Sequence, residues 1–215
     1  MSRLMHRSRS LVTENNPKSA VSEIYRSLRT KITFSNRDTA LKTVMITSAL
    51  PGEGKSTTAA NVAVAYAQAN KRVLLIDADL RTPVQHHIFE LNNDRYGLST
   101  ALAKHSELDA IIQQTRVENL YVLSAGPEPN GPSELLESPE MTALLEQAKA
   151  RFDIVIIDTP PVMTVTDALI VANKTDGVVL VVKPGKVKND TAAKAMAALE
   201  YGQATVIGAV LNRAR

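Results

Sequence analysis

The sequence predicts an α/β fold, a doubly wound and mostly parallel sheet with helices on both faces. Apolar runs recur along the chain without the polar alternation of a one-sided sheet, which is typical of strands buried on both faces. Segments of helical character separate these runs, and strands that alternate with helices indicate parallel pairing. The predicted strands are Lys42–Ser48, Arg72–Asp79, Leu120–Ser124, Asp153–Asp158, Gly177–Val182 and Thr205–Leu211.

Length and composition favour one compact domain. A chain of 215 residues can bury a sizeable core, and we expect a single domain over residues 17–215, preceded by a flexible basic N-terminus at residues 1–16. The sequence has no Cys, which excludes disulfides, thiolate catalysis and Cys-based zinc sites and agrees with a reducing cytoplasm. Its four His lack metal-ligand spacing, so they are interpreted as surface or core residues.

The charge is concentrated at the start of the chain. The net charge is +3, and the first ten residues hold Arg3, Arg7 and Arg9 without an acid. The remaining chain is close to neutral, which argues against a nucleic-acid partner. The basic start is either a solvated tail or a weak contact for anionic lipid or an acidic protein. No apolar run approaches the roughly 18 residues of a membrane span, so membrane association would need a partner.

The first predicted helix begins at Pro17. Its apolar residues recur at three- and four-residue spacing and form one stripe. Glu23, Arg26 and Arg29 fall on the opposite side, either as an ordinary solvated face with weak ion pairs or as a docking surface for another subunit. The stripe consists of Val21, Ile24, Tyr25, Leu28 and Ile32.

The segment Ala49–Ser56, ALPGEGKS, follows the first predicted strand and precedes a helix through about Ala69. It fits the P-loop pattern G-x-x-x-x-G-K-[ST] except at Ala49, and it occurs in the strand–loop–helix order of a P-loop NTPase fold. The alternative is a glycine-containing turn with no ligand. In a P-loop, backbone N–H groups and the helix N-terminus bind phosphate, Lys55 reaches the β- and γ-phosphates, and the Ser56 hydroxyl binds Mg²⁺. The residues expected at the nucleotide are Gly52, Glu53, Gly54, Lys55, Ser56 and Thr57.

Acidic residues stand at the ends of two later strands. Asp77 and Asp79 follow one apolar run, and Asp158 ends another before Thr159-Pro160-Pro161. Ligands of open α/β sheets bind at the carboxyl ends of the strands. Asp77 and Asp79 are therefore expected to serve Mg²⁺ or a nucleophile's proton, although capping of a turn is an alternative. Asp158 fits the Walker B pattern, in which an Asp contacts Mg²⁺ directly or through water.

The remaining elements follow in order. Residues 80–118 predict short helical pieces joined by polar loops, and Gly126–Pro132 is a turn-rich loop. Helices are predicted over Ser138–Arg151, from Thr166-Asp167 onward by capping chemistry, and over Asn189–Tyr201.

Together, these motifs resemble those of the bacterial tyrosine kinases of capsular and extracellular polysaccharide synthesis, in their stand-alone cytoplasmic form. The resemblance extends from Pro17 to Asn212 and is more specific than a P-loop alone. The matching segments are Ser22–Thr30 with the pattern E-x-x-R-x-x-R, Leu75–Arg81 with D-x-D-x-R, Gly126-Pro127, Pro132–Leu136 and Asp158–Asp167.

The resemblance implies a Mg²⁺-ATP-dependent protein tyrosine kinase. Lys55 and Ser56 would hold phosphates and Mg²⁺, Asp79 and Asp158 would complete the metal's surroundings, and Asp77 would accept the proton of the tyrosine hydroxyl. Phosphoryl transfer depends on positioning and charge neutralisation, which agrees with these roles.

The resemblance also implies partners. Glu23, Arg26 and Arg29 match the helix through which such kinases assemble into a homo-oligomeric ring, in which each subunit presents tyrosines to its neighbour. A separate membrane-anchored protein related to polysaccharide chain-length regulators would activate the kinase through its cytoplasmic tail and recruit it to the inner face of the membrane. In a related class of ATPases, the residue matching Asn212 meets adenine.

Two features keep other functions open. Kinases of this family usually end in a tyrosine-rich tail, whereas this sequence ends at Arg215 and its five tyrosines fall in predicted folded regions. Either a tail has been removed, or the acceptor lies on other proteins, or activity has decayed and leaves a regulator that binds ATP and caps rings. The alternative function is an ATP-gated assembly switch like the partitioning and division-site ATPases. Those proteins carry a second lysine where Leu50 stands and lack the E-x-x-R-x-x-R helix, which favours the kinase.

Overall fold

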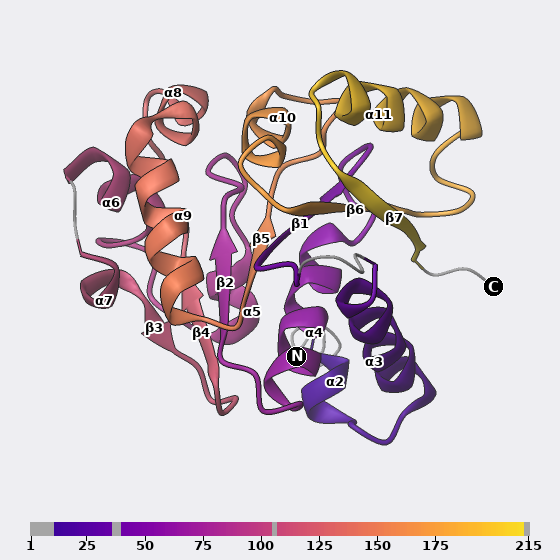
Figure 1. The fold of residues 1–215 in the computed structure, drawn as a ribbon, viewed down its shortest axis with the longest axis horizontal. Coiled ribbons are helices and arrows are strands. Elements are labelled where there is room, and N and C mark those ends of the chain that lie inside the picture. Colours follow the sequence, from indigo (N-terminus) through magenta and orange to yellow (C-terminus); the bar gives the residue numbers. More distant parts are fainter. Residues whose placement is uncertain (1–10, 36–39, 105–106, 213–215) are drawn as a thin grey trace, which may run out of the picture.

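A computed structural model describes residues 11–35, 40–104 and 107–212. Within them, one sheet of seven strands has the order β3-β4-β2-β5-β1-β6-β7 (Figure 1). Its strand pairs are parallel except for β3–β4, which is antiparallel. The strands are β1 (Thr43–Ser48), β2 (Val73–Asp77), β3 (Gln113–Gln114), β4 (Leu120–Leu123), β5 (Ile154–Asp158), β6 (Gly177–Val182) and β7 (Val206–Leu211).

The helices cover both faces of this sheet, so the predicted doubly wound α/β fold is confirmed. Alternate residues of β1 point into two separate apolar cores, with Met45 in one and Val44 and Ile46 in the other. Helices α2 to α5 contribute to the second core, and α6 to α11 to the first. The helices are α2 (Val12–Asn15), α3 (Ala20–Thr33), α4 (Lys55–Ala67), α5 (Gln85–Phe89), α6 (Leu98–Lys104), α7 (Leu108–Ile111), α8 (Pro132–Glu137), α9 (Pro139–Arg151), α10 (Asp167–Ala172) and α11 (Asn189–Tyr201).

The end of the predicted flexible N-terminus is ordered. Residues 1–10 of that segment lie outside the described residues, but residues 11–16 include helix α2. Leu11 is fully buried, and the Thr13 hydroxyl donates a 2.9 Å hydrogen bond to Asn61 Oδ1 of α4. The prediction of a flexible segment through residue 16 was therefore wrong for residues 11–16. A buried leucine, two buried hydrogen bonds from Thr13 to Asn61 and the Glu14–Arg116 ion pair hold a segment whose sequence is mostly polar.

Helix α3 packs differently from its sequence pattern. Tyr25 and Ile32 of the predicted stripe are buried, whereas Val21 and Ile24 are 47% and 63% exposed. The helix packs on α4, and this contact leaves part of the apolar stripe exposed. Ser19 accepts a hydrogen bond from Ser22 N and begins the helix as an N-cap.

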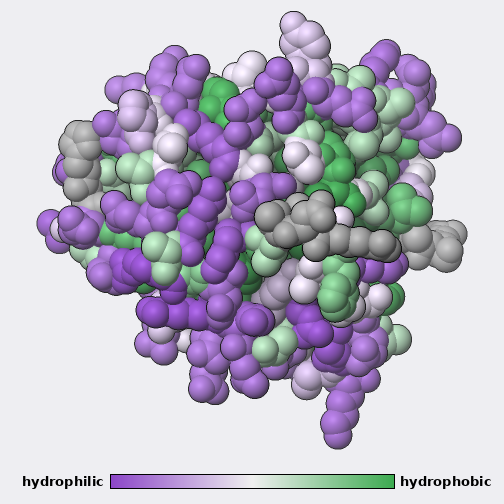
Figure 2. All heavy atoms as spheres, viewed as in Figure 1, coloured by the Kyte–Doolittle hydropathy of each residue, from purple (hydrophilic) through white to green (hydrophobic). Residues whose placement is uncertain are grey.

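The molecular surface in the view of Figure 2 is mostly hydrophilic, with apolar side chains gathered near β6 and β7. Strand β7 lies at the edge of the sheet, and Leu211 at its end is 63% exposed. Among the helices of the described residues, none is long and apolar enough to cross a membrane.

Candidate active site

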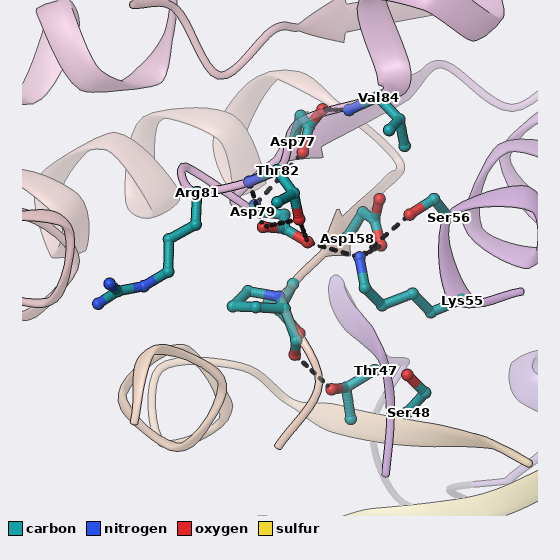
Figure 3. Close-up of polar contacts among 12 residues, drawn as sticks. Thr47, Ser48, Lys55, Ser56, Asp77, Asp79, Arg81, Thr82, Val84 and Asp158 are labelled. Atoms are coloured by element: carbon teal, nitrogen blue, oxygen red, sulfur yellow. Dashed lines mark hydrogen bonds and ion pairs between the residues drawn. The ribbon is translucent and has the colours of Figure 1, made fainter. Parts of the chain in front are cut away.

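Three neighbouring strands bring the predicted site residues to one edge of the sheet. Strand β5 lies between β2 and β1, and its last residue, Asp158, is in register with Asp77 on one side and Ile46 on the other. The P-loop follows β1 directly. Because these strands are parallel, their carboxyl ends meet, and Lys55, Asp77, Asp79 and Asp158 come together there (Figure 3).

The P-loop has a backbone that requires glycine at two positions. Gly52 and Gly54 have φ values of 75° and 96°, in the left-handed region that other residues rarely adopt. A Cβ on Gly54 would lie 2.0 Å from Asn212 Nδ2, and one on Gly52 would lie 2.5 Å from Lys186 Nζ. Helix α4 begins at Lys55, so its free N–H groups open toward the loop. This arrangement fits a phosphate group held by backbone N–H groups.

Glu53 and Asn212 hold the P-loop in shape. The buried Glu53 carboxylate accepts hydrogen bonds from Leu50 N and, at 2.9 Å, from Lys183 N, which follows β6. The Asn212 side chain donates to Glu53 O at 2.7 Å. The sequence prediction grouped both residues with the nucleotide. In the structure the Asn212 side chain contacts the loop, and the Glu53 carboxylate joins the loop to the end of β6, so both side chains support the shape of the phosphate cradle.

Lys55 lies among buried carboxylates. Its Nζ is 2.7 Å from Asp79 Oδ2, 3.5 Å from Asp158 Oδ1 and 3.1 Å from Ser56 Oγ (Figure 3). Burial disfavours the charged ammonium, but the Asp158 and Asp79 charges outweigh it, and the pKa of Lys55 is raised. The lysine is therefore positively charged in this site.

Asp77 is fully buried and holds the start of α5. Its Oδ2 accepts hydrogen bonds from Val84 N at 3.0 Å and from Gln85 N at 2.9 Å. Burial, together with the negative charge of Asp158, raises the pKa of Asp77 to about 8. A carboxyl group whose pKa lies near neutrality is suited to accept a proton during a reaction.

Asp79 and Asp158 are held by neutral donors as well as by Lys55. Thr82 N donates to Asp79 Oδ1 at 3.0 Å, and Gln85 Nε2 donates to Asp158 Oδ2 at 2.8 Å. Burial raises the pKa of Asp158, although Lys55 acts in the opposite direction. Sequence reasoning missed Gln85 and Thr82, since a glutamine or threonine in a loop after a strand has no motif of its own.

The residues of this edge fit a nucleotide with a divalent cation. Lys55 faces three buried carboxylates, so the cluster carries excess negative charge when these acids are ionised. Within the described part of the chain, no group of three or more His, Cys, Asp or Glu is arranged to hold a metal ion by itself. In nucleotide sites Mg²⁺ keeps few protein ligands and binds phosphate oxygens and water.

Arg81 joins three elements beside the site. Its Nε and Nη2 donate to the two carboxylate oxygens of Asp167 at 2.9 and 3.1 Å, and Ser133 Oγ donates to Asp167 Oδ1 at 2.7 Å. The sequence predicted capping at Thr166-Asp167, but the Thr166 side chain makes no capping hydrogen bond. The Asp167 carboxylate instead accepts hydrogen bonds from Arg81, in the loop after β2, and from Ser133, in the first turn of α8.

Because of the Arg81–Asp167 ion pair, we predict that Asp167→Asn lowers stability in a pH-dependent way. Burial acts to raise the pKa of Asp167, but hydrogen bonds from Arg81 and Ser133 outweigh it and the pKa is lowered. The stabilisation is therefore present above the carboxyl's ordinary pKa and is lost as the pH falls through the lowered value. We expect Asp167→Asn to lower the free energy of unfolding by about 1–2 kcal/mol near pH 7. The figure is kept small because the Arg81 side chain is 39% exposed, so solvent screens the ion pair.

Urea unfolding of Asp167→Asn and of the parent, near pH 7 and near pH 3, measures this loss. The difference between the two proteins should shrink at the lower pH. Asp190→Asn, at the exposed Lys194–Asp190 pair of α11, is the matched control. A difference that is the same at both pH values would contradict the role of the ion pair.

Comparisons with known proteins identify the family. A family model described as an AAA domain matches residues 41–203. The tyrosine-protein kinase YwqD of Bacillus subtilis is 48% identical over 204 residues, which cover 95% of this chain and 86% of that protein. The chain belongs to the bacterial tyrosine-protein kinases. It is a protein-tyrosine kinase that binds a nucleotide, and the expectation drawn from its motifs is confirmed.

Solved structures of this kinase family superpose closely. The chimerical protein CapA2B2 has a TM-score of 0.91 and 44% identity, covering 96% of this chain and 90% of that chain. The kinase domain of Escherichia coli tyrosine kinase ETK has a TM-score of 0.90 and 36% identity, covering 95% of this chain and 82% of that chain.

The alternative function is not favoured by these comparisons. The septum site-determining protein MinD of Pyrococcus horikoshii has a TM-score of 0.68 and 24% identity, covering 80% of this chain and 70% of that chain. At that distance the likeness shows the shared P-loop fold alone.

Proposed function

We propose that this kinase transfers the γ-phosphoryl group of Mg²⁺-ATP to tyrosine hydroxyls of proteins at the edge formed by β1, β2 and β5. The observation that supports this most is the position of Lys55, whose ammonium lies between the end of the P-loop and the carboxylates of Asp79 and Asp158. Positive charge, a phosphate cradle and proton acceptors are the groups that phosphoryl transfer needs in one place.

The phosphates would bind at the N-terminus of α4. Backbone N–H groups of Gly52–Thr57 would donate to phosphate oxygens, and Lys55 would neutralise charge on the transferred group. In the structure Lys55 pairs with Asp79, so we infer that its ammonium moves from that carboxylate to phosphate on binding. Asn212 lies against the loop at Gly54, and we propose that it also borders the adenine.

Ser56, Asp79 and Asp158 would hold the magnesium ion, directly or through water. When bound there, Mg²⁺ supplies neutralisation of phosphate charge. The protein's part is to keep these side chains at one place, which the Lys55 and Thr82 contacts of Asp79 and the Gln85 contact of Asp158 accomplish.

Asp77 would act on the acceptor. As the tyrosine oxygen forms its bond to the γ-phosphorus, the bond from that phosphorus to the β–γ bridging oxygen breaks and ADP leaves. The hydroxyl proton passes to the Asp77 carboxylate. The two backbone donors at Val84 and Gln85 hold this carboxylate in one orientation, as positioning of a general base requires.

The test is incubation of the full chain with Mg²⁺-ATP and a tyrosine-containing acceptor, followed by mass spectrometry for phosphotyrosine. We expect phosphotyrosine that depends on Mg²⁺ and on Lys55. Release of ADP without phosphotyrosine, even with a tyrosine-tailed relative as acceptor, would favour the ATP-gated switch.

We further propose that the kinase regulates the synthesis and export of capsular or extracellular polysaccharide. The support is its resemblance to the bacterial kinases of that process. On the same ground, its activator is the cytoplasmic tail of a membrane-anchored protein, which would recruit the kinase from the cytoplasm to the inner face of the membrane.

The α3 helix would form the contact between subunits of a ring. Arg26 Nε donates to Glu23 Oε1 at 2.8 Å, and Arg29 Nη1 donates to Ala65 O at 3.2 Å, so both arginines are oriented within the subunit. The neighbouring Val21 and Ile24 are exposed and would add apolar contact area.

Replacement of Glu23, Arg26 and Arg29 by Ala is expected to convert the oligomer to a monomer, because charged contacts across an interface fix its register. Light scattering with Mg²⁺ and ATP measures this. Ala at Asp190 and Lys194, an exposed pair on α11, is the control and should leave the oligomer intact. A parent chain that is monomeric at high concentration would contradict ring assembly.

A further inference from the structure

Gln85 contacts three of the elements that build the site. Its backbone N–H donates to Asp77 Oδ2 at 2.9 Å. Its side-chain Nε2 donates to Asp158 Oδ2 at 2.8 Å and to Ser56 O, in the first turn of α4, at 3.1 Å. One residue at the start of α5 therefore joins the ends of β2 and β5 to the P-loop helix.

The orientation of the Gln85 amide follows from its partners. The Asp158 carboxylate oxygen and the Ser56 carbonyl oxygen are both acceptors, so the amide must direct its NH₂ group toward them. The residue is fully buried, and among the described residues no donor reaches its Oε1. An apolar side chain would avoid burying such an oxygen, so packing alone does not account for a glutamine here.

The two oxygens of Asp158 are held from different sides. Lys55 Nζ lies 3.5 Å from Oδ1, and Gln85 Nε2 lies 2.8 Å from Oδ2. When Lys55 turns to phosphate, the Gln85 hydrogen bond still holds the carboxylate. The same NH₂ group also donates to the Ser56 carbonyl oxygen, so it fixes the position of the Asp158 carboxylate relative to Ser56, whose hydroxyl is the other proposed ligand.

We propose that Gln85 is a positioning residue for the magnesium site, which orients the Asp158 carboxylate toward the first turn of α4. This rests on the proposed function, in which Ser56 and Asp158 hold Mg²⁺. Side chains that orient metal ligands typically contribute ten- to hundredfold to metal affinity.

The test is Gln85→Met in the full chain, because methionine has a similar length and no amide. Calorimetric titration with ADP, with and without Mn²⁺ as the probe metal, separates metal binding from nucleotide binding. We expect the gain in ADP affinity on adding Mn²⁺ to fall about ten- to hundredfold, with ADP binding without metal changed by less than about threefold.

A kinetic split gives a second readout. The Mg²⁺ concentration for half-maximal phosphotransfer should rise in Gln85→Met by a factor similar to the loss of Mn²⁺ affinity, and saturating Mg²⁺ should restore most of kcat. Gln113→Met is the matched control, since the Gln113 amide also joins two segments, at Asn92 O and Ser124 Oγ, outside the site. It should leave the Mn²⁺ effect at the parent value.

The proposal is overturned if Gln85→Met unfolds at a lower temperature but keeps the parent's Mn²⁺ effect, since that is a packing role alone. If Gln85→Met does not fold, Gln85→Glu takes its place. It keeps the length but sets a carboxylate against Asp158, and it should weaken the Mn²⁺ effect at least as much. If the ADP affinity of the parent chain does not change when Mn²⁺ is added, the magnesium site of the proposed function would instead be overturned.

Discussion

Lys55→Met is expected to lower phosphotransfer to a tyrosine acceptor by about a thousandfold or more, the range found when a cation or donor is removed from a phosphoryl-transfer site. Methionine has a similar length but carries no charge to neutralise the transferred group. In the structure the lysine ammonium is within 3.5 Å of both Asp79 and Asp158, so the substitution removes charge from the centre of the site.

The same substitution should also lower stability near neutral pH. Without the ammonium, the buried carboxylates repel one another, and removal of one partner from a buried ion pair typically costs about 3–5 kcal/mol. The loss should be smaller at acid pH, where the carboxyl groups take up protons. Urea unfolding of Lys55→Met and of the parent, at neutral and at acid pH, measures the loss of stability. A phosphotransfer assay by mass spectrometry measures the loss of activity.

Lys71→Met is the matched control, because Lys71 is exposed in the turn before β2. It should retain the activity and stability of the parent. Undiminished phosphotransfer in folded Lys55→Met would remove the P-loop lysine from the mechanism.

Asp77→Asn is expected to reduce kcat by about 10²–10⁴, the usual contribution of a general base, with ATP binding changed only a few-fold. The amide oxygen of asparagine can still accept from Val84 N and Gln85 N, so the start of α5 should keep its shape. It has no carboxylate to accept a proton from the tyrosine hydroxyl.

Asp77→Ala separates the two roles of this residue. Alanine loses the proton acceptor and also leaves the backbone N–H groups of Asp79, Val84 and Gln85 without this acceptor, so it should be less stable than Asp77→Asn by about 1–3 kcal/mol. Thermal unfolding of both variants, beside single-turnover phosphotransfer, measures the two effects. Parent-like kcat in Asp77→Asn would exclude this carboxylate as the base.

The central strands β1, β2 and β5, and with them the site edge, could be predicted because burial on both faces produces continuous apolar runs in the sequence. Asn189–Tyr201 and Gly177–Val182 match their predicted bounds. Strand β3 was not predicted, since Gln113-Gln114 is polar and pairs only at the sheet edge. The apolar stripe of α3 was predicted, but not how many of its residues are buried, because periodicity does not show how much of a helix face a neighbouring element covers.

The sequence by itself determined which acids and which lysine meet. A P-loop after one buried strand and acids at the ends of two others must lie at one edge if the strands are parallel, whatever the rest of the chain does. Only the tertiary structure decided how they are held. The hydrogen bonds from Gln85 to Asp158 and from Lys183 to Glu53 join residues 73 and 130 positions apart, and hydrogen bonds at that separation depend on packing and leave no local pattern.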